Sequence, residues 1–321
     1  MKLAVSVQAV FAHAAVARSS EEGRLLTLLH PSRGLVPFGV VVDWGEARLS
    51  TNDTLILAER TLCLGEDRLV ELEGEGLDLM VRPSPVSWAS LRTQLEALRL
   101  RPRTRELLGA GSDDLIVRTA AKRLDALIDA LTVGAGARES GAGASERRAP
   151  REGRMKLPLG HLDVSSAELE PGPSYPAELE LRPPGALLLP PLIAALVGLG
   201  PGSTPTGDDL LTGLAACLLR LGPAFVLPKT SSEAFLAALK TLPHGRTTAT
   251  AAEMLRHAAD GAFPEVLVEF VTRLGNEQTK PEALQRAADA LAELGAQTGT
   301  DMLAGVLKLA RRASSNHGGL S

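Results

Sequence analysis

A glycine- and proline-rich stretch that runs directly into an amphipathic helix constrains this 321-residue chain more than any other feature. Residues 198–209 read GLGPGSTPTGDD, and apolar residues then recur at helical spacing over residues 210–219. Glycines let backbone N–H groups approach a ligand closely, prolines hold the shape of a loop, and the first turn of a helix leaves N–H donors free for an anion. The stretch therefore predicts a rigid loop that feeds a helix N-terminus.

A second copy of this pattern lies near the C-terminus, where residues 298–305 read TGTDMLAG. Aligned with residues 206–213, it repeats the threonine, the first glycine, the second aspartate, the leucine and the last glycine. Asp208 alone becomes a hydroxyl residue, Thr300. A pattern that occurs twice constrains the fold more than a single copy does.

Each copy places a glycine four residues after an aspartate, on the same helical face. Two helices can therefore approach closely along Gly213 and Gly305, which would bring Asp209 and Asp301 to a shared cleft. The alternative is that these aspartates only stabilise helix N-termini and that the glycines serve packing. Two copies beside a long rigid loop favour a ligand site.

The composition indicates a folded, soluble protein and excludes two classes of partner. Hydrophobic residues make up 45% of the chain and charged residues 22%, a globular balance. The formal net charge is −4, lysines and arginines are scattered, and aromatic residues make up only 3%, so nothing indicates a nucleic-acid surface. The longest apolar run carries prolines and is too short to span a bilayer, so we expect a cytoplasmic protein without membrane contact.

The hydrophobic period changes near Pro85 from short strand-like runs to helical spacing. The fold class predicted is α+β, with a small β-rich, barrel- or sandwich-like N-terminal domain and a mainly α-helical C-terminal domain. The predicted parts are a β-rich domain (1–84), a helical connector (85–133), a flexible Gly/Ala/Arg-rich loop (134–155), a mainly helical domain with the signature loop (156–313) and a frayed tail (314–321).

Individual elements follow from the same patterns. Strands are predicted at residues 25–29, 40–42, 54–58, 69–72, 71–79 and 177–181. Helices are predicted at residues 185–197, 208–221, 235–239, 248–259, 265–274, 281–294 and 300–312. Residues 134–154 cannot bury enough apolar surface to offset the entropy of ordering, so we expect them to be mobile and dispensable.

Three carboxylates, Asp208, Asp209 and Asp301, lie close in sequence to threonine hydroxyls and are oxygen ligands of the kind that Mg²⁺ prefers. Carboxylates repel phosphate, so a phosphate-binding loop here needs a bridging Mg²⁺ or amides that face the anion in place of the aspartates. The stretch is not a P-loop, because no Lys-Ser/Thr pair follows its glycines. The sequence thus leaves a metal site and an anion site open.

A third segment, residues 244–250, again joins a glycine turn to a helix start. Arg246 is a candidate bidentate partner for a carboxylate or phosphate, and Thr247 or Thr248 a candidate helix cap. His244 has the chemistry of an acid or base, although a surface histidine near a turn is the alternative. The histidines and the two cysteines show no metal-binding spacing.

The signature from Gly200 to Asp209 resembles that of a bacterial protein family that includes the AllH subunit of oxamate carbamoyltransferase. Residues 25–31 and 37–41 are similar to the N-terminal region of that family, and residues 246–248 and 298–301 to its two later motifs. The family commonly has leucine in place of Ser203 and serine in place of Thr206. Residues 134–154 have no counterpart in it.

The resemblance implies a subunit of a hetero-oligomeric enzyme that exchanges a carbamoyl group among carbamoyl phosphate, oxamate and oxalurate. The alternative is a non-catalytic binding or assembly subunit whose signature loop is structural. The predicted catalytic residues, which also form the possible Mg²⁺ site, are Asp208, Asp209 and Asp301. The residues predicted to bind a small anionic substrate are Gly200, Gly202, Ser203, Thr204, Thr206, Gly207, Arg246, Thr247, Thr298, Gly299 and Thr300. In this prediction, backbone amides and Arg246 hold the anion, while Asp209 and Asp301 hold Mg²⁺ or orient an amide N–H.

Overall fold

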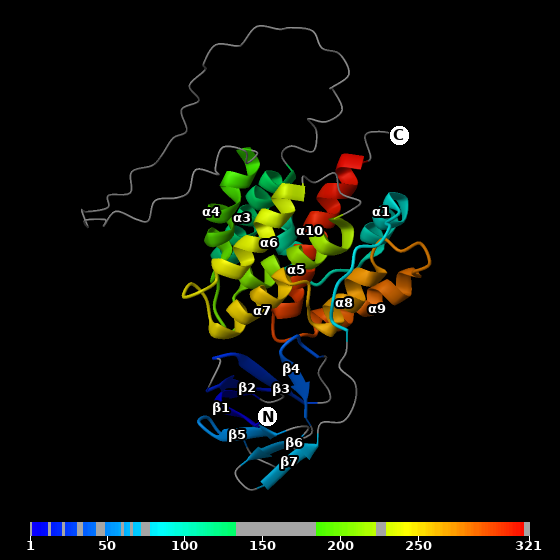
Figure 1. The fold of residues 1–321 in the computed structure, drawn as a ribbon. Helices are drawn as coiled ribbons and strands as arrows, with labels where there is room; N and C mark the ends of the chain where they lie inside the picture. The colour runs from blue at the N-terminus through cyan, green and yellow to red at the C-terminus, as the bar shows by residue number, and fades with distance from the viewer. Residues whose placement is uncertain are drawn as a thin grey trace, which may run out of the picture.

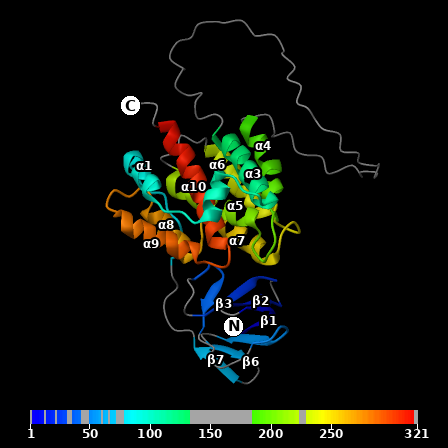
Figure 2. The same cartoon turned by 180° about the vertical axis from the view of Figure 1, so that it is seen from behind.

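The computed structural model describes residues 2–11, 14–20, 23–30, 35–42, 49–58, 61–64, 67–71, 78–132, 184–222 and 229–317. In this part of the chain a β-sheet comes first and helices follow, and the sheet lies at one end of the helical domain (Figure 1 and Figure 2). The predicted α+β class, with its β-rich N-terminal and helical C-terminal parts, is confirmed. The predicted strand at 177–181 and the predicted mobile stretch 134–154 lie outside the described residues.

The sheet has seven strands in the order β4-β3-β2-β1-β5-β6-β7. Only the pairing of β3 with β4 is parallel; the other neighbours are antiparallel. The strands are β1 (Lys2–Phe11), β2 (Ala14–Ser19), β3 (Leu25–Leu29), β4 (Gly39–Val41), β5 (Thr54–Ala58), β6 (Thr61–Leu64) and β7 (Asp67–Glu71). The sequence patterns predicted β3, β4, β5 and the region of β7, whereas residues 78 and 79 at the end of the predicted strand 71–79 are not in a strand.

Strands β2 and β3 are buried on both faces of the sheet. Ala15, Ala17 and Leu28 pack into a small core formed within the sheet domain. The alternate residues Val16 and Leu29 belong to the large core of the helical domain. Because successive strand residues point to opposite faces, one face of this sheet packs into the small core of the sheet domain and the other packs against the helices.

The helical domain contains α1 (Trp88–Ala97), α2 (Pro102–Arg105), the π-helical turn η1 (Glu106–Ala110), α3 (Leu115–Thr132), α4 (Pro184–Leu196), α5 (Thr206–Leu221), α6 (Lys229–Thr241), α7 (Ala249–Ala259), α8 (Glu265–Arg273), α9 (Pro281–Ala292) and α10 (Thr298–His317). No helix in the described part of the chain is both long and apolar enough to cross a bilayer. Helix α10 extends to His317, past the point where a frayed tail was predicted.

The predicted helical connector, residues 85–133, is an integral part of this domain. Leu91, Leu107 and Leu124 are fully buried in the same core as α5 and α10. The leucines of this segment recur at helical spacing because they pack into the core of the helical domain. The connector therefore contributes to the packing of the domain that carries the signature loop.

Backbone hydrogen bonds and ring stacking join the sheet to the helices. The N–H of Glu265 donates to the carbonyl of Leu35 at 2.9 Å, and the N–H of Leu35 donates to the Glu265 carboxylate at 3.1 Å. The Phe38 ring stacks on His257 of α7 with centroids 5.5 Å apart. These contacts fix the sheet domain against the end of α7 and the start of α8.

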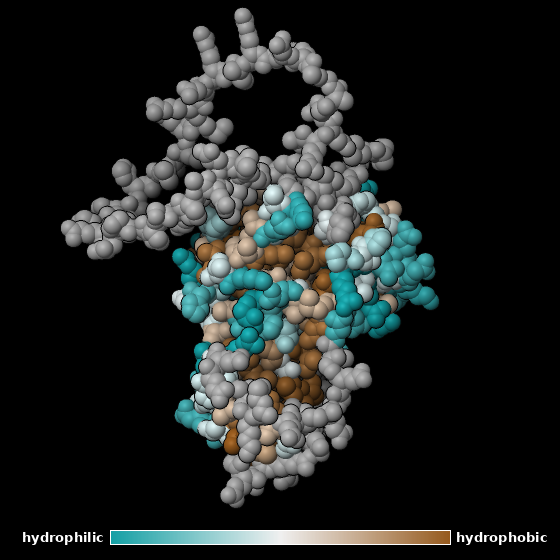
Figure 3. Space-filling view, viewed as in Figure 1, coloured by the Kyte–Doolittle hydropathy of each residue, from teal (hydrophilic) through white to brown (hydrophobic). Residues whose placement is uncertain are grey.

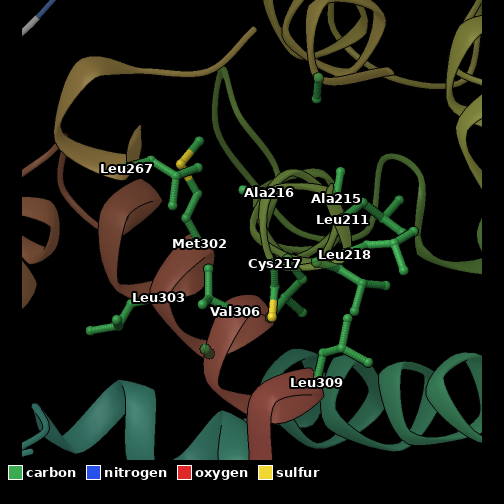
Figure 4. Packing of buried hydrophobic residues seen from close by; sticks show 14 of the residues in the cluster. Leu211, Ala215, Ala216, Cys217, Leu218, Leu267, Met302, Leu303, Val306 and Leu309 are labelled. Atoms are coloured by element: carbon green, nitrogen blue, oxygen red, sulfur yellow. The ribbon is translucent and has the colours of Figure 1, made fainter. Parts of the chain in front are cut away.

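Helices α5 and α10 cross at two glycines, as the repeat predicted. A Cβ atom added to Gly213 would lie 1.9 Å from the carbonyl oxygen of Met302, and one added to Gly305 would lie 2.2 Å from that of Leu210. Leu210 and Met302 occupy equivalent positions in the two copies, so the crossing is nearly symmetric. Met302 and Cys217 lie at this interface (Figure 4).

Candidate functional site

Both copies of the motif enter their helix by the same tight turn. The N–H of Gly207 donates to the carbonyl of Leu199 at 2.9 Å, and the N–H of Gly299 donates to that of Leu294 at 2.9 Å. A Cβ on Gly207 would lie 1.9 Å from the Leu196 carbonyl oxygen, and a Cβ on Gly299 would be equally excluded. The glycines are therefore required by close backbone packing, and the first copy differs in having a longer loop before its turn.

Asp208 ties three segments together. Its carboxylate accepts the N–H of Gly198 at 3.2 Å, and its Oδ2 accepts the hydroxyl of Thr247 at 2.5 Å. Burial raises the pKa of Asp208 to about 6, although these two hydrogen bonds oppose the rise. Asp208 thus fastens the 242–248 turn to the signature loop.

Asp301 forms a bidentate ion pair with Arg103 of α2. The Arg103 Nε lies 2.6 Å from Oδ1 and its Nη2 lies 2.9 Å from Oδ2 of Asp301. The same Nη2 donates to the hydroxyl of Thr206 at 2.8 Å, so one guanidinium joins the starts of α5 and α10. The hydrogen bond to Asp301 raises the pKa of Arg103 against the opposing effect of burial.

The sequence does not single out Arg103, because its segment, LRLRPRTR over residues 98–105, contains four arginines. Arg103 lies 198 residues before Asp301 in the sequence. Pro102 marks a helix start, but Arg103 and Arg105 both lie in the single turn that follows it, so the local sequence does not distinguish them.

Asp209, the equivalent of Asp301 in the first copy, has no such partner. Its side chain is 1% exposed, and neither carboxyl oxygen has a hydrogen-bond partner in the described part of the chain. Burial raises the pKa of Asp209 well above its usual range, and the Asp301 carboxylate raises it further. The hydroxyls of Thr204 and Thr298 oppose this rise. Asp209 is therefore biased toward the neutral acid.

The hydroxyls of Thr204 and Thr298 lie 2.7 Å apart and separate Asp209 from a cavity. This interdomain cavity, of about 580 Å³, lies between the sheet and the two motif turns. Hydrophobic residues gather where the sheet meets the helical domain (Figure 3). The apolar lining consists of Phe11, Ala14, Val16, Leu29, Val36, Phe38, Pro201, Met254, Leu294 and Ala296. The rest of the lining consists of Thr27, Gly202, Ser203, Thr204, Thr250, Gly295, Gln297 and Thr298.

The cavity has a polar floor, and the part of its wall that the structure describes carries no charge. Its floor is formed by residues 201–204 and 294–298, the two turns that precede α5 and α10. None of the described lining residues is Asp, Glu, Lys, Arg or His. A ligand here meets hydroxyls, an amide side chain and backbone groups at two helix N-termini.

The remaining predicted residues lie around this floor. Gly200 has a φ of 115° and packs against the backbone of Thr206, so glycine is needed there for both conformation and space. The Thr300 hydroxyl donates to the Gln297 carbonyl at 2.6 Å. It holds the second turn in place of the aspartate found in the first copy.

The structure places Arg246 outside the cavity lining, with an exposed side chain. Its carbonyl, not its guanidinium, faces the signature loop at Gly198. Of the two candidate caps, Thr248 accepts the N–H of Ala251 at 3.1 Å and so begins α7, whereas Thr247 binds Asp208. His244 is exposed.

The carboxylates do not form a metal-binding cluster. Within the described ranges, no three His, Cys, Asp or Glu residues are placed to hold one ion. Asp208 is engaged by Thr247 and Gly198, and Asp301 by Arg103, which leaves Asp209 alone. The donor set does not fit Mg²⁺ as it is arranged.

Fold and site together define an α+β protein in which two crossing helices begin with the same Thr-Gly-x-Asp turn beside an interdomain cavity. The family model described as oxamate carbamoyltransferase subunit AllH matches residues 196–309, from the end of α4 into α10. This match supports the AllH-like resemblance that the signature predicted. No solved structure matches it.

Proposed function

We propose that this chain is a subunit of an oxamate carbamoyltransferase-type enzyme and that the floor of its interdomain cavity holds the small substrate. The observation that carries the proposal is that both copies of the motif, inside the segment that matches the family model, meet at this floor, with an unpartnered buried carboxyl behind it. A carboxyl buried without a partner is costly, and such groups concentrate at functional sites.

The floor offers donors for an anionic or amide group. Thr204 and Thr298 line the cavity with their hydroxyls hydrogen-bonded to each other, and the turns present the N-termini of α5 and α10, which favour negative charge. Asp209 lies behind these hydroxyls, which oppose the rise of its pKa, and is a positioning residue. Because the described lining has no charged side chain, the cations that bind phosphate come from the other subunits.

The reaction itself needs alignment more than covalent catalysis. The amide nitrogen of oxamate bonds to the carbamoyl carbon, the bond from that carbon to the phosphate oxygen breaks, and phosphate departs as the nitrogen loses one proton. Carbamoyl phosphate is already activated, so a subunit that holds the acceptor in line supplies much of the rate.

The test is Asp209→Asn in the complex reconstituted from all its subunits, with Asp113→Asn, an exposed aspartate, as the matched control. Asparagine keeps the shape of the side chain and cannot exist as either a carboxylic acid or a carboxylate. We expect Asp209→Asn to abolish carbamoyl transfer while circular dichroism and complex assembly stay unchanged, and Asp113→Asn to retain full turnover.

A second candidate function is a non-catalytic assembly subunit, and the symmetric glycine crossing of α5 and α10 favours it, since that crossing is purely structural. It predicts wild-type turnover for Asp209→Asn. That result would end the proposed substrate role of the floor.

A further inference from the structure

A groove, called here the α1–α10 groove, crosses the surface of the helical domain between α1, η1 and the second half of α10. It consists of two adjoining hollows, of about 320 and 590 Å³, that share Leu98 and Arg311. Helix α1 lies beside α10 at the end of the helical domain away from the sheet (Figure 1 and Figure 2). Arg311 lies about 20 Å along α10 from Thr298, at about 1.5 Å per helical residue. The groove is therefore separate from the interdomain cavity.

The groove combines apolar side chains with arginines. Its first hollow is lined by Leu98, Leu100, Arg105, Leu108, Ala110 and Arg311. The three leucines are partly buried and pack against the large core, so the base of this hollow is held by the fold. Arginine is enriched beside apolar side chains at the centre of protein–protein interfaces.

Arg105 and Arg311 have no carboxylate partner in the described part of the chain, whereas the neighbouring Arg312 pairs with Asp129 at 2.6 Å. Burial lowers the pKa of Arg311, and no described carboxylate opposes this fall. Burial also lowers the pKa of Arg220, but that guanidinium donates to two backbone carbonyls. Arg311 has thus lost part of its hydration without gaining an acceptor, a cost that a bound carboxylate removes.

The chemistry of the groove selects its occupant. Glu96 lines the second hollow, but its exposed side chain forms no ion pair with Arg105 or Arg311 among the described residues. A guanidinium binds a carboxylate through two parallel hydrogen bonds, so two free guanidinium groups favour an acidic ligand. A small inorganic anion would leave the leucines in water, and a purely apolar ligand would leave the arginines unpaired. The occupant therefore carries both acidic and aliphatic groups.

We propose that the α1–α10 groove docks a segment of another subunit of the enzyme, in which carboxylates pair with Arg105 and Arg311 and an aliphatic side chain packs against Leu98. Two adjoining hollows that span α1, η1 and α10 suit neighbouring side chains of one protein segment. That the partner is a subunit of the enzyme rests on the proposed function. The charge and shape of the groove do not depend on it.

The test measures the affinity of the full chain for the separately purified other subunits by sedimentation velocity. Arg105→Glu/Arg311→Glu should weaken assembly by about 30-fold or more, because each attraction becomes a repulsion. The matched control is Arg118→Glu/Arg286→Glu, which makes the same change of net charge at exposed arginines of α3 and α9 outside the groove. We expect the control to assemble like the wild type.

Two further variants separate the parts of the interaction. Arg105→Gln/Arg311→Gln removes both charges without repulsion and should weaken assembly about tenfold, which keeps the test decisive if the glutamate variant does not fold. Ala110→Phe fills the first hollow while both arginines remain, and it should also weaken assembly, whereas Ala290→Phe, at an exposed site of α9, should not. Circular dichroism and melting temperature check the fold of each variant.

Assembly that is unchanged in both arginine variants would overturn the inference, as would an equal loss in the matched control or a wild-type chain that does not assemble with the other subunits. Two other occupants would also overturn it. Self-association of the isolated chain that Arg105→Glu/Arg311→Glu abolishes would assign the groove to a second copy. Binding of octanoate below about 1 mM that the same variant loses, with assembly retained, would assign it to a small organic anion.

Failure of this inference is distinguishable from failure of the proposed function. A complex that assembles without the two arginines ends the inference and leaves the substrate role of the cavity floor standing. Wild-type turnover of Asp209→Asn ends that substrate role and leaves docking at the groove intact. The two assays use variants at separate sites of the domain.

Discussion

The two copies of the Thr-Gly-x-Asp motif have the same backbone and opposite electrostatics. Both begin a helix through a glycine turn, and both place a glycine at the crossing of α5 and α10. In the second copy Asp301 forms a bidentate ion pair with Arg103, whereas in the first copy the equivalent Asp209 is buried without a partner. A symmetric scaffold thus holds one satisfied and one unsatisfied carboxyl side by side.

The difference comes from outside the repeat. Arg103 belongs to α2, which precedes both copies and also precedes the segment that matches the family model. It pairs with Asp301 and with Thr206, so it fixes the two helix starts relative to each other and leaves Asp209 alone. The comparison separates a structural carboxylate from one that is available for function.

The largest loss of stability is expected from substitution of the glycine that both copies place at the crossing of α5 and α10. Gly305→Ala and Gly213→Ala each place a methyl group within 2.2 and 1.9 Å of a backbone oxygen on the other helix, and a backbone atom cannot rotate away. We expect each to lower the free energy of unfolding by about 3 kcal/mol or more. Urea denaturation measures it.

The matched control is Gly222→Ala. Gly222 has a right-handed helical backbone, and an added Cβ meets nothing within 4 Å. Its stability should stay unchanged or rise by about 0.5 kcal/mol. Equal behaviour of Gly305→Ala and Gly222→Ala would mean that α5 and α10 do not touch as described.

The second prediction addresses the difference between the copies. Asp301→Asn leaves the partly buried Arg103 guanidinium without its carboxylate and should cost about 2–3 kcal/mol of stability. Asp209→Asn removes a carboxyl that has no partner and should be neutral or stabilising by up to about 1 kcal/mol. Both are compared by urea denaturation at pH 7. A larger loss for Asp209→Asn than for Asp301→Asn would reverse our assignment of the two roles.

The repeat and the crossing of its helices could be predicted from the sequence because helical periodicity fixes which residues share a face. Gly213 and Gly305 fall four residues after an aspartate, and that spacing alone places them against a neighbouring backbone. The change of period near Pro85 likewise separated sheet from helices, since strands and helices need different apolar spacing.

The partners of the carboxylates could not be predicted, because they depend on tertiary packing across long sequence separations. Nothing local distinguishes Arg103 from its neighbouring arginines, and nothing distinguishes Thr247, which binds Asp208, from Thr248, which caps α7. Arg246 has the right chemistry for an anion, but the turn exposes its side chain and presents its carbonyl to the loop. Residue type indicated the possible chemistry, and only the fold decided which group supplies it.

The last prediction uses pH to sharpen the same comparison. Burial raises the pKa of Asp209 in the folded chain above its value in the unfolded chain, so the folded state holds a proton that the unfolded state has lost. Stability must then fall as pH rises above the ordinary aspartate range near 4, by at most about 1.4 kcal/mol per pH unit, until the folded carboxyl ionises. The Asp209→Asn variant lacks this pH-dependent loss of stability. Its stability relative to wild type should therefore increase from pH 5 to pH 7, as measured by urea denaturation at each pH.

Asp208, whose pKa is raised to about 6, is present in both proteins, and its contribution largely cancels in the difference. A constant difference would show that Asp209 is ionised in the folded chain with an unseen partner.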